Sequence, residues 1–384
     1  MEYFKSLPDD ITLEILTRLP AESVLESKLV CKNWRSLVSH HPLFSRMHLQ
    51  YVNHPSDPGN LGFLVRDHDF DDLDQVQGLT LWYLDYNDKL ESKPVQRITR
   101  FNFTPPPRHF WVVGSVHGLI CLGRGPSFLI CNPITREYVL LPEIKRDQDE
   151  GIDIDFSCMS GFCYVSSTNE YKVIRIDADM NPSIVHIYTL GSGNGWRKLG
   201  NNFSSEWCHF HWNDAALYWL DDELKMIGTF DFVEEKFGEF ISPPPLPPDS
   251  EWFCCHLGVL DGSLYFIGNV DLIEDDIHDS WLFKPKNNDN AMKKGDGHRA
   301  LGWSQEFKVE KTRLLEVAKS CGAFNLYWYH LSSYNIKAST SKMLVDFKQR
   351  NCKLIPHKNT LVSLKEFGEL DTKTMETVER HKEP

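Results

Sequence analysis

The sequence lacks the features that mark membrane and secreted proteins. No stretch of its 384 residues approaches 18 uninterrupted apolar side chains, so we expect no transmembrane helix. Met1–Pro8 lacks the basic-then-apolar order of a secretory signal. The ten cysteines are scattered, and several lie in apolar runs, namely Cys121, Cys131, Cys163, Cys254 and Cys255. We interpret them as reduced, buried side chains, and we expect the protein in the cytoplasm, the nucleus or both.

Basic side chains are fewer than acidic ones. The chain has 41 Lys and Arg against 54 Asp and Glu, which gives a formal net charge of −13. The acidic surplus lies in residues 51–384. An acidic body disfavours non-specific binding of nucleic acid, so we expect neither a nucleic-acid nor a membrane partner. The charge is compatible with a basic protein partner, although acidic surfaces usually serve only solubility.

Sequence motifs of common catalytic sites are absent or incomplete. The chain has no Gly-x-Ser-x-Gly and no His-Glu-x-x-His. Gly191–Gly195 is rich in glycine, but no Gly-Lys-Ser/Thr follows, and the next segment is typical of a strand. A phosphate-binding loop needs a helix N-terminus at that point, so we interpret this segment as a hairpin turn.

Two segments hold metal-ligating residue types without the matching spacing. An EF-hand loop over Asp67–Gly78 would need Gly at its sixth position and Glu at its twelfth, where the chain has Asp and Gly. In Cys208–His211, strand alternation places the cysteine on one face and both histidines on the other. We therefore expect no metal and no cofactor.

The first 50 residues hold the most informative pattern that is present. Pro8 and Pro20 bracket a short helix in which Ile11, Ile15 and Leu19 recur every four residues and form one apolar stripe. Pro8 suits the first turn of a helix, because that turn has no use for the missing N–H. The segment therefore predicts an amphipathic helix.

Two more helices are predicted after Pro20. The first begins at Ala21 and carries Val24, Leu25 and Leu29 on its apolar face, and the next contains Trp34 and ends at His41-Pro42. Three helices in so short a segment keep a large surface fraction and cannot bury all these side chains. The surplus implies a partner, and the alternative is an ordinary helical start to a larger core.

Residues 4–46 resemble an F-box, the module that docks an F-box protein onto the Skp-family linker of an SCF-type ubiquitin ligase. The resemblance is carried by Leu7-Pro8, by Ile15–Pro20, by Val30–Leu37 and by the closing Pro42-Leu43-Phe44. It implies a Skp-family linker and, through it, a cullin scaffold as partners. The residues implied in linker binding are Leu7, Pro8, Ile11, Ile15, Leu16, Leu19, Pro20, Val24, Leu25 and Trp34. Among them we expect Leu7, Pro8, Ile11 and Leu16 nearer the partner, with Trp34 packing the third helix.

Beyond Gln50 the pattern is that of many short antiparallel strands. Runs of Val, Ile, Tyr, Phe and Trp alternate with turn residues, and Asn213-Asp214 and Asp261-Gly262 are predicted hairpin turns. A loose repeat of about 40–55 residues favours five or six units of about four strands. The predicted fold is therefore α+β multidomain, a three-helix module followed by an all-β domain. A β-propeller is preferred for that domain, with a two-sheet sandwich as the alternative.

The same region resembles the F-box-associated domain of plant F-box proteins. Stretches that carry the resemblance include Val113–Leu122, Cys131–Glu137, Tyr171–Ile176 and Ala216–Leu220. The chain departs from the family at His117, where Asn is frequent. It has no Gly-Gly doublet, which argues against strict kelch repeats and leaves a kelch-like propeller.

The predicted organisation is an F-box at residues 1–50, a β domain at 51–370 and a charged, frayed tail at 371–384. We expect few contacts across Tyr51–Asn60, so that a fragment starting near residue 55 would fold alone. The one complication is that a strand at Leu61–Val65 could pair with Leu361–Leu364 to close the ring.

The resemblances imply a substrate receptor that performs no chemistry itself. Target capture is expected on loops of the β domain, at Asp67–Asp74, Lys145–Gly151 and Lys284–His298, with Asp69, Asp71 and Asp72 as the candidate contacts. Strand positions such as Ile174 or Leu217 should affect folding instead. The alternatives are a propeller enzyme acting on a small molecule and an F-box protein acting outside a ubiquitin ligase.

Overall fold

A computed structural model describes most of the chain. The described residues are 7–52, 61–67, 79–86, 95–101, 110–144, 158–177, 184–199, 210–213, 216–221, 224–246, 255–260, 263–268, 277–285, 301–310, 313–318, 322–327, 330–335, 340–348 and 352–375. The chain divides into two compact units. Unit 1 holds Met1–Asp155, Thr189–Trp196 and Cys352–Pro384, and unit 2 holds Phe156–Tyr188 and Arg197–Asn351.

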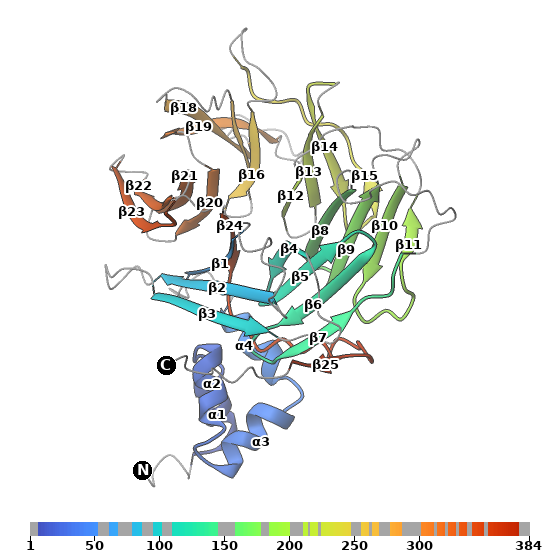
Figure 1. The fold of residues 1–384 in the computed structure, drawn as a ribbon, viewed down its shortest axis with the longest axis vertical. Helices are drawn as coiled ribbons and strands as arrows, with labels where there is room; N and C mark the ends of the chain where they lie inside the picture. Colours follow the sequence, from blue (N-terminus) through green and yellow to red (C-terminus); the bar gives the residue numbers. More distant parts are fainter. Residues whose placement is uncertain are drawn as a thin grey trace, which may run out of the picture. The chain divides into compact units, whose positions relative to one another are not determined.

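The first described stretch of unit 1, residues 7–52, forms four short helices, drawn in blue in Figure 1. They are α1 (Asp9–Leu16), α2 (Ala21–Ser27), α3 (Lys32–His40) and α4 (Phe44–Val52). Pro8 and Pro20 stand directly before α1 and α2, at the N-cap position, one residue earlier than the first-turn position expected for Pro8. The first three helices match the prediction, and α4 is an addition that the sequence analysis missed.

The described strands of unit 1 form two antiparallel sheets. The first has the order β24-β1-β2-β3 and the second the order β25-β7-β6-β5-β4. Their strands are β1 (Leu61–Asp67), β2 (Leu79–Tyr86), β3 (Val95–Phe101), β4 (Trp111–Val116), β5 (Leu119–Arg124), β6 (Ser127–Asn132), β7 (Glu137–Leu140), β24 (Cys352–His357) and β25 (Lys373–Thr374). The edge strands β24 and β4 contact each other, and apolar side chains of both sheets form one core.

Two predictions about the end of the chain need correction. The strand that pairs with β1 is β24, from Gly62 opposite His357 to Asp67 opposite Cys352, and not Leu361–Leu364. The tail is not frayed from its start, because β25 pairs with β7 and Met375 is buried in the core of unit 1. Residues 376–384 lie outside the described part.

The described residues of unit 2 form four antiparallel sheets of four strands each, in the orders β11-β10-β9-β8, β12-β13-β14-β15, β16-β17-β18-β19 and β20-β21-β22-β23. Their strands are β8 (Cys158–Val165), β9 (Glu170–Asp177), β10 (Ile184–Thr189), β11 (Arg197–Leu199), β12 (Phe210–Asn213), β13 (Ala216–Asp221), β14 (Met226–Asp231), β15 (Lys236–Phe237), β16 (His256–Leu260), β17 (Ser263–Ile267), β18 (Ile277–Pro285), β19 (Leu301–Glu310), β20 (Arg313–Ala318), β21 (Gly322–Tyr327), β22 (His330–Asn335) and β23 (Thr340–Asp346).

The first strand of each sheet in unit 2 lies beside the first strand of the next. Strand β12 contacts both β8 and β16, and β16 contacts β20. Each sheet thus has one inner edge strand and continues outward by short antiparallel steps, as in the blades of a propeller. The separate sheets confirm the prediction of a propeller-like β domain and not the sandwich alternative.

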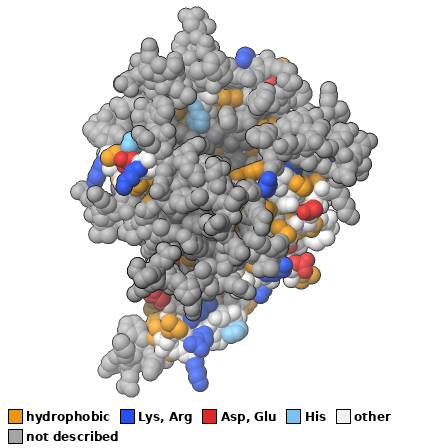
Figure 2. All heavy atoms as spheres, in the orientation of Figure 1, with side chains coloured by type: hydrophobic (Ala, Val, Ile, Leu, Met, Phe, Trp, Pro, Cys, Tyr) orange, Lys and Arg blue, Asp and Glu red, His pale blue; other side chains and the backbone are white. Residues whose placement is uncertain are grey.

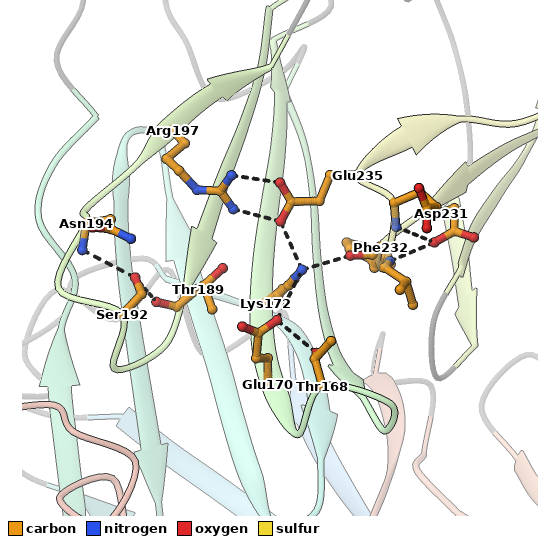
Figure 3. A network of polar contacts seen from close by, with 12 residues as sticks. Thr168, Glu170, Lys172, Thr189, Ser192, Asn194, Arg197, Asp231, Phe232 and Glu235 are labelled. Carbon is orange, nitrogen blue, oxygen red and sulfur yellow. Dashed lines mark hydrogen bonds and ion pairs between the residues drawn. The ribbon is translucent and has the colours of Figure 1, made fainter.

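A polar cluster joins the first two sheets of unit 2 (Figure 3). Lys172 of β9 is 4% exposed, and its ammonium donates to the carbonyl of Phe232 at 2.8 Å and to Glu235 at 2.9 Å. Arg197 of β11 donates to both carboxylate oxygens of Glu235, each at 2.7 Å. These hydrogen bonds hold the pKa of Glu235 below its ordinary value. Beneath the cluster, apolar side chains of both sheets pack together.

The turns follow the sequence closely. Leu260 pairs with Ser263 and Asn213 with Ala216, so both predicted hairpins are confirmed, the second with its loop one residue later than expected. Gly191–Gly195 lies in the connection between β10 and β11, which pair as a hairpin, as predicted. In that turn, Ser192 Oγ donates to the carbonyl of Thr189 at 2.8 Å (Figure 3).

The described cysteines lie where the sequence analysis expected them, with one difference. Cys121, Cys131 and Cys163 are buried, whereas Cys255 is only half-buried. Burial raises the pKa of the Cys121 and Cys131 thiols. Within the described ranges, no helix combines the length and apolar character that crossing a membrane requires.

Candidate docking surface

The four helices form a module, residues 7–52, with a small apolar core. Its buried members are Leu13, Leu16, Ala21, Val24, Leu37 and Phe44, and Leu361 from the other end of the chain completes the cluster. Partly buried side chains pack around it, namely Leu19, Leu25, Trp34, Val38 and Ile134. The module therefore has its core at the centre of the four helices and shares that core with the β domain.

Helix α1 divides its apolar side chains between two faces. Leu13 and Leu16 point inward and are 8% and 0% exposed, whereas Ile11 and Ile15 are 45% and 41% exposed. Positions four apart lie on one side of a helix, so the two isoleucines form an outward apolar stripe. The stripe predicted from the sequence is confirmed for these two residues, and its direction is away from the core.

Further large apolar side chains are exposed elsewhere in the module. Leu29 and Val30, in the turn between α2 and α3, are 79% and 58% exposed, and Leu43, just before α4, is 51% exposed. Figure 2 shows hydrophobic side chains on the surface of this helical part of the chain. Exposed apolar side chains gathered on so small a module are typical of a site for a protein partner.

Local hydrogen bonds fix the helices that carry these side chains. Asn33 Nδ2 donates to Asp9 Oδ1 at 2.9 Å, which ties the start of α3 to the start of α1. The backbone N–H of Trp34 donates to Cys31 Sγ at 3.4 Å, so the cysteine caps α3. Arg35 Nε donates to the carbonyl of Lys28 at 3.1 Å and closes the turn that displays Leu29 and Val30.

The charged side chains near the stripe are exposed. Arg18 pairs with Glu14 on α1, and its guanidinium lies 5.2 Å from the centre of the Tyr51 ring. An exposed pair of this kind contributes little to stability. Partial burial lowers the pKa of Lys28. The surface is therefore suited to binding by apolar contact, with charge at its margin.

Two comparisons with known families match these two parts of the chain. An F-box domain matches residues 4–46, and an F-box associated beta propeller domain matches residues 72–254. The chain therefore carries an F-box domain and an F-box-associated domain. The first match covers the helices whose exposed stripe is described above, and the second covers sheets of both units.

Relatives from Arabidopsis thaliana agree with this family. F-box protein At3g07870 is 30% identical over 45% of this chain and 37% of its own length. F-box only protein 8 is 26% identical over 62% of this chain and 80% of its own length. F-box/kelch-repeat protein At4g19930 is 25% identical over 82% of this chain and 72% of its own length. The chain thus spans about a third of the first relative and most of the other two.

The predicted residues of the F-box fall into an outward and an inward group. Pro8, Ile11, Ile15 and Pro20 are exposed, Leu7, Leu19, Leu25 and Trp34 are half-buried, and Leu16 and Val24 are buried. Trp34 packs against the core of the module, as expected. Leu16 was expected nearer the partner, but it has no exposed surface, so it belongs to the core.

The sequence analysis missed part of the exposed surface of the F-box. Leu29 was assigned to the apolar face of the second helix, but α2 ends at Ser27 and Leu29 lies in the turn beyond it. Val30 and Leu43 were noted only as parts of motifs. The available signal was a large apolar residue directly after the end of one helix or directly before the start of the next. A side chain at such a position lies on no helix face that could bury it.

The predicted target-binding residues cannot be placed. Asp69, Asp71 and Asp72 lie outside the described residues, as does Lys145–Gly151, and of Lys284–His298 only Lys284 and Pro285 are described. Ile174 and Leu217, named as folding positions, are each 1% exposed. In the described ranges, no three His, Cys, Asp or Glu side chains group as a metal ion would require.

Proposed function

We propose that this chain is the substrate-recognition subunit of an SCF-type ubiquitin ligase. In this proposal the F-box docks onto a Skp-family linker and, through it, a cullin scaffold, while the β domain captures a target protein. The observation that carries the proposal is the outward stripe of Ile11 and Ile15 on an F-box whose core is filled by its own side chains together with Leu361.

The geometry favours docking by apolar burial. Covering a side chain such as Ile11 or Ile15 removes apolar area from water, worth about 25 cal/mol per Å². Leu29, Val30 and Leu43 add further area on the same module. The linker needs no rearrangement of the F-box core to reach these side chains, because they already face outward.

The chain itself performs no chemistry in this proposal. Ubiquitin transfer takes place on partner subunits, and the receptor raises the effective concentration of the target's lysines near the ubiquitin-charged enzyme. A propeller enzyme would instead need polar side chains that converge on a substrate. No such constellation was found in the sequence.

The test of docking is a pull-down of the purified full chain with a purified Skp-family linker. Replacing Leu7 and Pro8 together by alanine should abolish co-purification, since Pro8 is exposed beside the start of α1 and Leu7 is half-buried. Circular dichroism should show the β domain still folded. Undiminished binding of the double variant would remove the proposed interface.

For target capture we keep the acidic segment as the proposed contact. Substituting Asp69, Asp71 and Asp72 by asparagine should reduce the set of co-purifying target proteins and the salt dependence of their capture. Linker binding should not change. An unaltered target set would leave this segment with a role in solubility only.

A further inference from the structure

The end of unit 1 is a segment that we call the C-terminal strap, Lys358–Met375. It follows β24, which completes the first sheet by pairing with β1, and it ends with β25, which pairs with β7. The backbone N–H of Met375 also donates to the carbonyl of Arg136 at 2.8 Å. The strap therefore connects two ordered strands of the β domain.

Buried side chains of the β domain hold the first part of the strap. Asn132 Nδ2 donates to the carbonyls of Thr360 and Val362, at 3.1 and 2.7 Å. Both contacts are buried, and Asn132 is 0% exposed. The carboxylate of Glu137 accepts from the backbone N–H of Leu364 at 2.7 Å. These bonds fix the path of the strap across the five-stranded sheet.

The second part of the strap is held by the β10–β11 turn. The backbone N–H of Gly191 donates to Glu369 Oε1 at 2.7 Å. Gly191 approaches the strap so closely that a Cβ there would lie 1.5 Å from the carbonyl oxygen of Phe367. Its φ of 71° is also in the region that favours glycine. The strap thus has a second fixed point on the β domain.

The other side of the strap contacts the F-box. Leu361 is 7% exposed and belongs to the same apolar cluster as Leu16 and Phe44. Figure 1 shows helix α4 close to β7 and β25, the strand pair at the end of the strap. A residue that follows the F-box by some 300 positions therefore fills part of its core.

Three polar contacts surround Leu361. Asn359 Nδ2 donates to Glu22 of α2, and Lys358 Nζ donates to the carbonyl at the end of α4. Ser45 Oγ of α4 donates to Glu366. Two helices of the F-box are thus bonded to the strap on both sides of the apolar contact.

Asn359 also continues a partly buried chain of hydrogen bonds into the β domain. Its Oδ1 lies 3.0 Å from His357 Nε2, and His357 Nδ1 lies 2.7 Å from Ser115 Oγ. Burial lowers the pKa of His357 to about 4. A neutral imidazole that donates from Nε2 and accepts at Nδ1 suits both partners. Asn359 is therefore held on one side by the β domain and on the other by Glu22.

We propose that the C-terminal strap positions the F-box and completes its core, so that linker docking requires the strap. The F-box is too small to bury its apolar side chains alone, and Leu361 supplies the missing contact. The positioning residue is Leu361, with Asn359 and Lys358 beside it. This inference rests on the proposed function.

The consequence is that the order of the F-box depends on the completion of the β domain. The same C-terminal stretch completes the first sheet through β24 and the F-box core through Leu361. A chain that stops before residue 352 lacks both contacts. Such a chain presents no well-ordered docking surface, so only receptors with a completed β domain join the ligase.

The test compares two leucines of the strap in the full chain. Leu361→Asp places a carboxylate in an apolar core, whereas Leu370→Asp makes the same change at a side chain that is 96% exposed. Isothermal titration with a purified Skp-family linker should show at least a ~10-fold loss of affinity for the first variant. The second variant should bind as wild type does. Equal affinity of a folded Leu361→Asp chain and wild type would overturn the proposal.

A milder pair of variants decides the matter if Leu361→Asp fails to fold. Leu361→Ala leaves a cavity, and Leu361→Met keeps the volume. For the alanine variant we expect weaker linker binding and faster amide hydrogen exchange in α1 and α3, with exchange in β5 and β6 unchanged. The methionine variant should show the linker binding and the exchange rates of the wild-type chain. Equal affinity and exchange for both variants would overturn the proposal. Failure of the wild-type chain to bind the linker would instead overturn the proposed function.

Discussion

Helix α1 and strand β6 are both rich in apolar side chains, but the strand buries all of them and the helix exposes some. In β6 every position from Phe128 to Asn132 is buried. In α1 the apolar positions divide between buried Leu13 and Leu16 and exposed Ile11 and Ile15. The strand lies between two neighbours within a sheet that is covered on both faces, whereas the helix has only one covered face. Apolar residues on the uncovered face of α1 are available to a partner.

The same contrast separates the polar contacts of the two regions. Lys172 and Glu235, which join two sheets of unit 2, have side chains 5% and 18% exposed. Glu14 of α1 and Arg18, two residues after its end, have side chains that are each 57% exposed. Buried charge pairs are costly to break, and exposed pairs contribute little. The charge pair of the β domain is thus largely buried, whereas the charge pair on the outer face of the F-box is exposed to solvent.

The largest expected effect comes from removing a buried side chain from the core of the F-box. Phe44 is 2% exposed and lies in the core of the module. Phe44→Ala should lower the free energy of unfolding by about 3–5 kcal/mol and abolish linker binding. The neighbouring Leu43 is 51% exposed, so Leu43→Ala should leave stability nearly unchanged. Denaturant unfolding followed by helical circular dichroism checks both, and similar losses for the two variants would remove the inward–outward division.

A smaller effect is expected from breaking the polar cluster of unit 2. Glu235→Gln removes the charge that Lys172 and Arg197 share, and should cost about 2 kcal/mol at neutral pH. Linker binding should not change, because the cluster lies in the β domain. Thermal unfolding of both chains, with Glu234→Gln as an exposed control, measures the loss.

The same variant makes a prediction about pH. The pKa of Glu235 lies below its ordinary value of 4.5 in the folded chain, so this carboxylate contributes stability above that value. The contribution is lost as the pH falls through the lowered pKa. The stability difference between wild type and Glu235→Gln should therefore shrink as the pH is lowered below about 4.5. A difference that is independent of pH would contradict the assigned charge pair.

The smallest expected effect concerns a turn of the β domain. His117 and Gly118 have φ values of 49° and 78°, so both central residues of the β4–β5 hairpin are left-handed. Asn is favoured over His in such a turn, and His117→Asn should raise the melting temperature slightly. Gly118→Ala should lower it, because a Cβ there would lie 2.4 Å from Thr360 Oγ1. A lower melting temperature for the asparagine variant would show that the His117 side chain stabilises the turn.

Much of this architecture could be predicted because local patterns decide it. The proline boundaries of α1 and α2, the strand runs and the hairpin turns all rest on backbone preferences of neighbouring residues. The apolar period of α1 also identified Ile11 and Ile15 as one stripe, and the motifs around them identified the F-box.

The parts that could not be predicted depend on contacts between distant residues. Helix α4 buries Phe44, His48 and Val52 at four-residue spacing, and the histidine in the middle hides the apolar period. The His48 ring can be buried because its Nε2 lies 2.9 Å from the carbonyl oxygen of Leu19, within hydrogen-bond distance. Likewise, nothing in Leu361–Leu364 indicates that it packs on helices instead of pairing as a strand.

The most direct test of the central claim compares two equally exposed apolar residues. Ile15 on α1 and Leu140 on β7 are each 41% exposed, so a glutamate at either position costs the folded chain little. Isothermal titration of each full-length variant against a purified Skp-family linker measures whether the exposed side chain contributes to linker binding. We predict that Ile15→Glu weakens binding at least ~10-fold and that Leu140→Glu binds as wild type does. Equal affinities for Ile15→Glu and wild type would contradict the claim that the outward face of α1 is the docking surface.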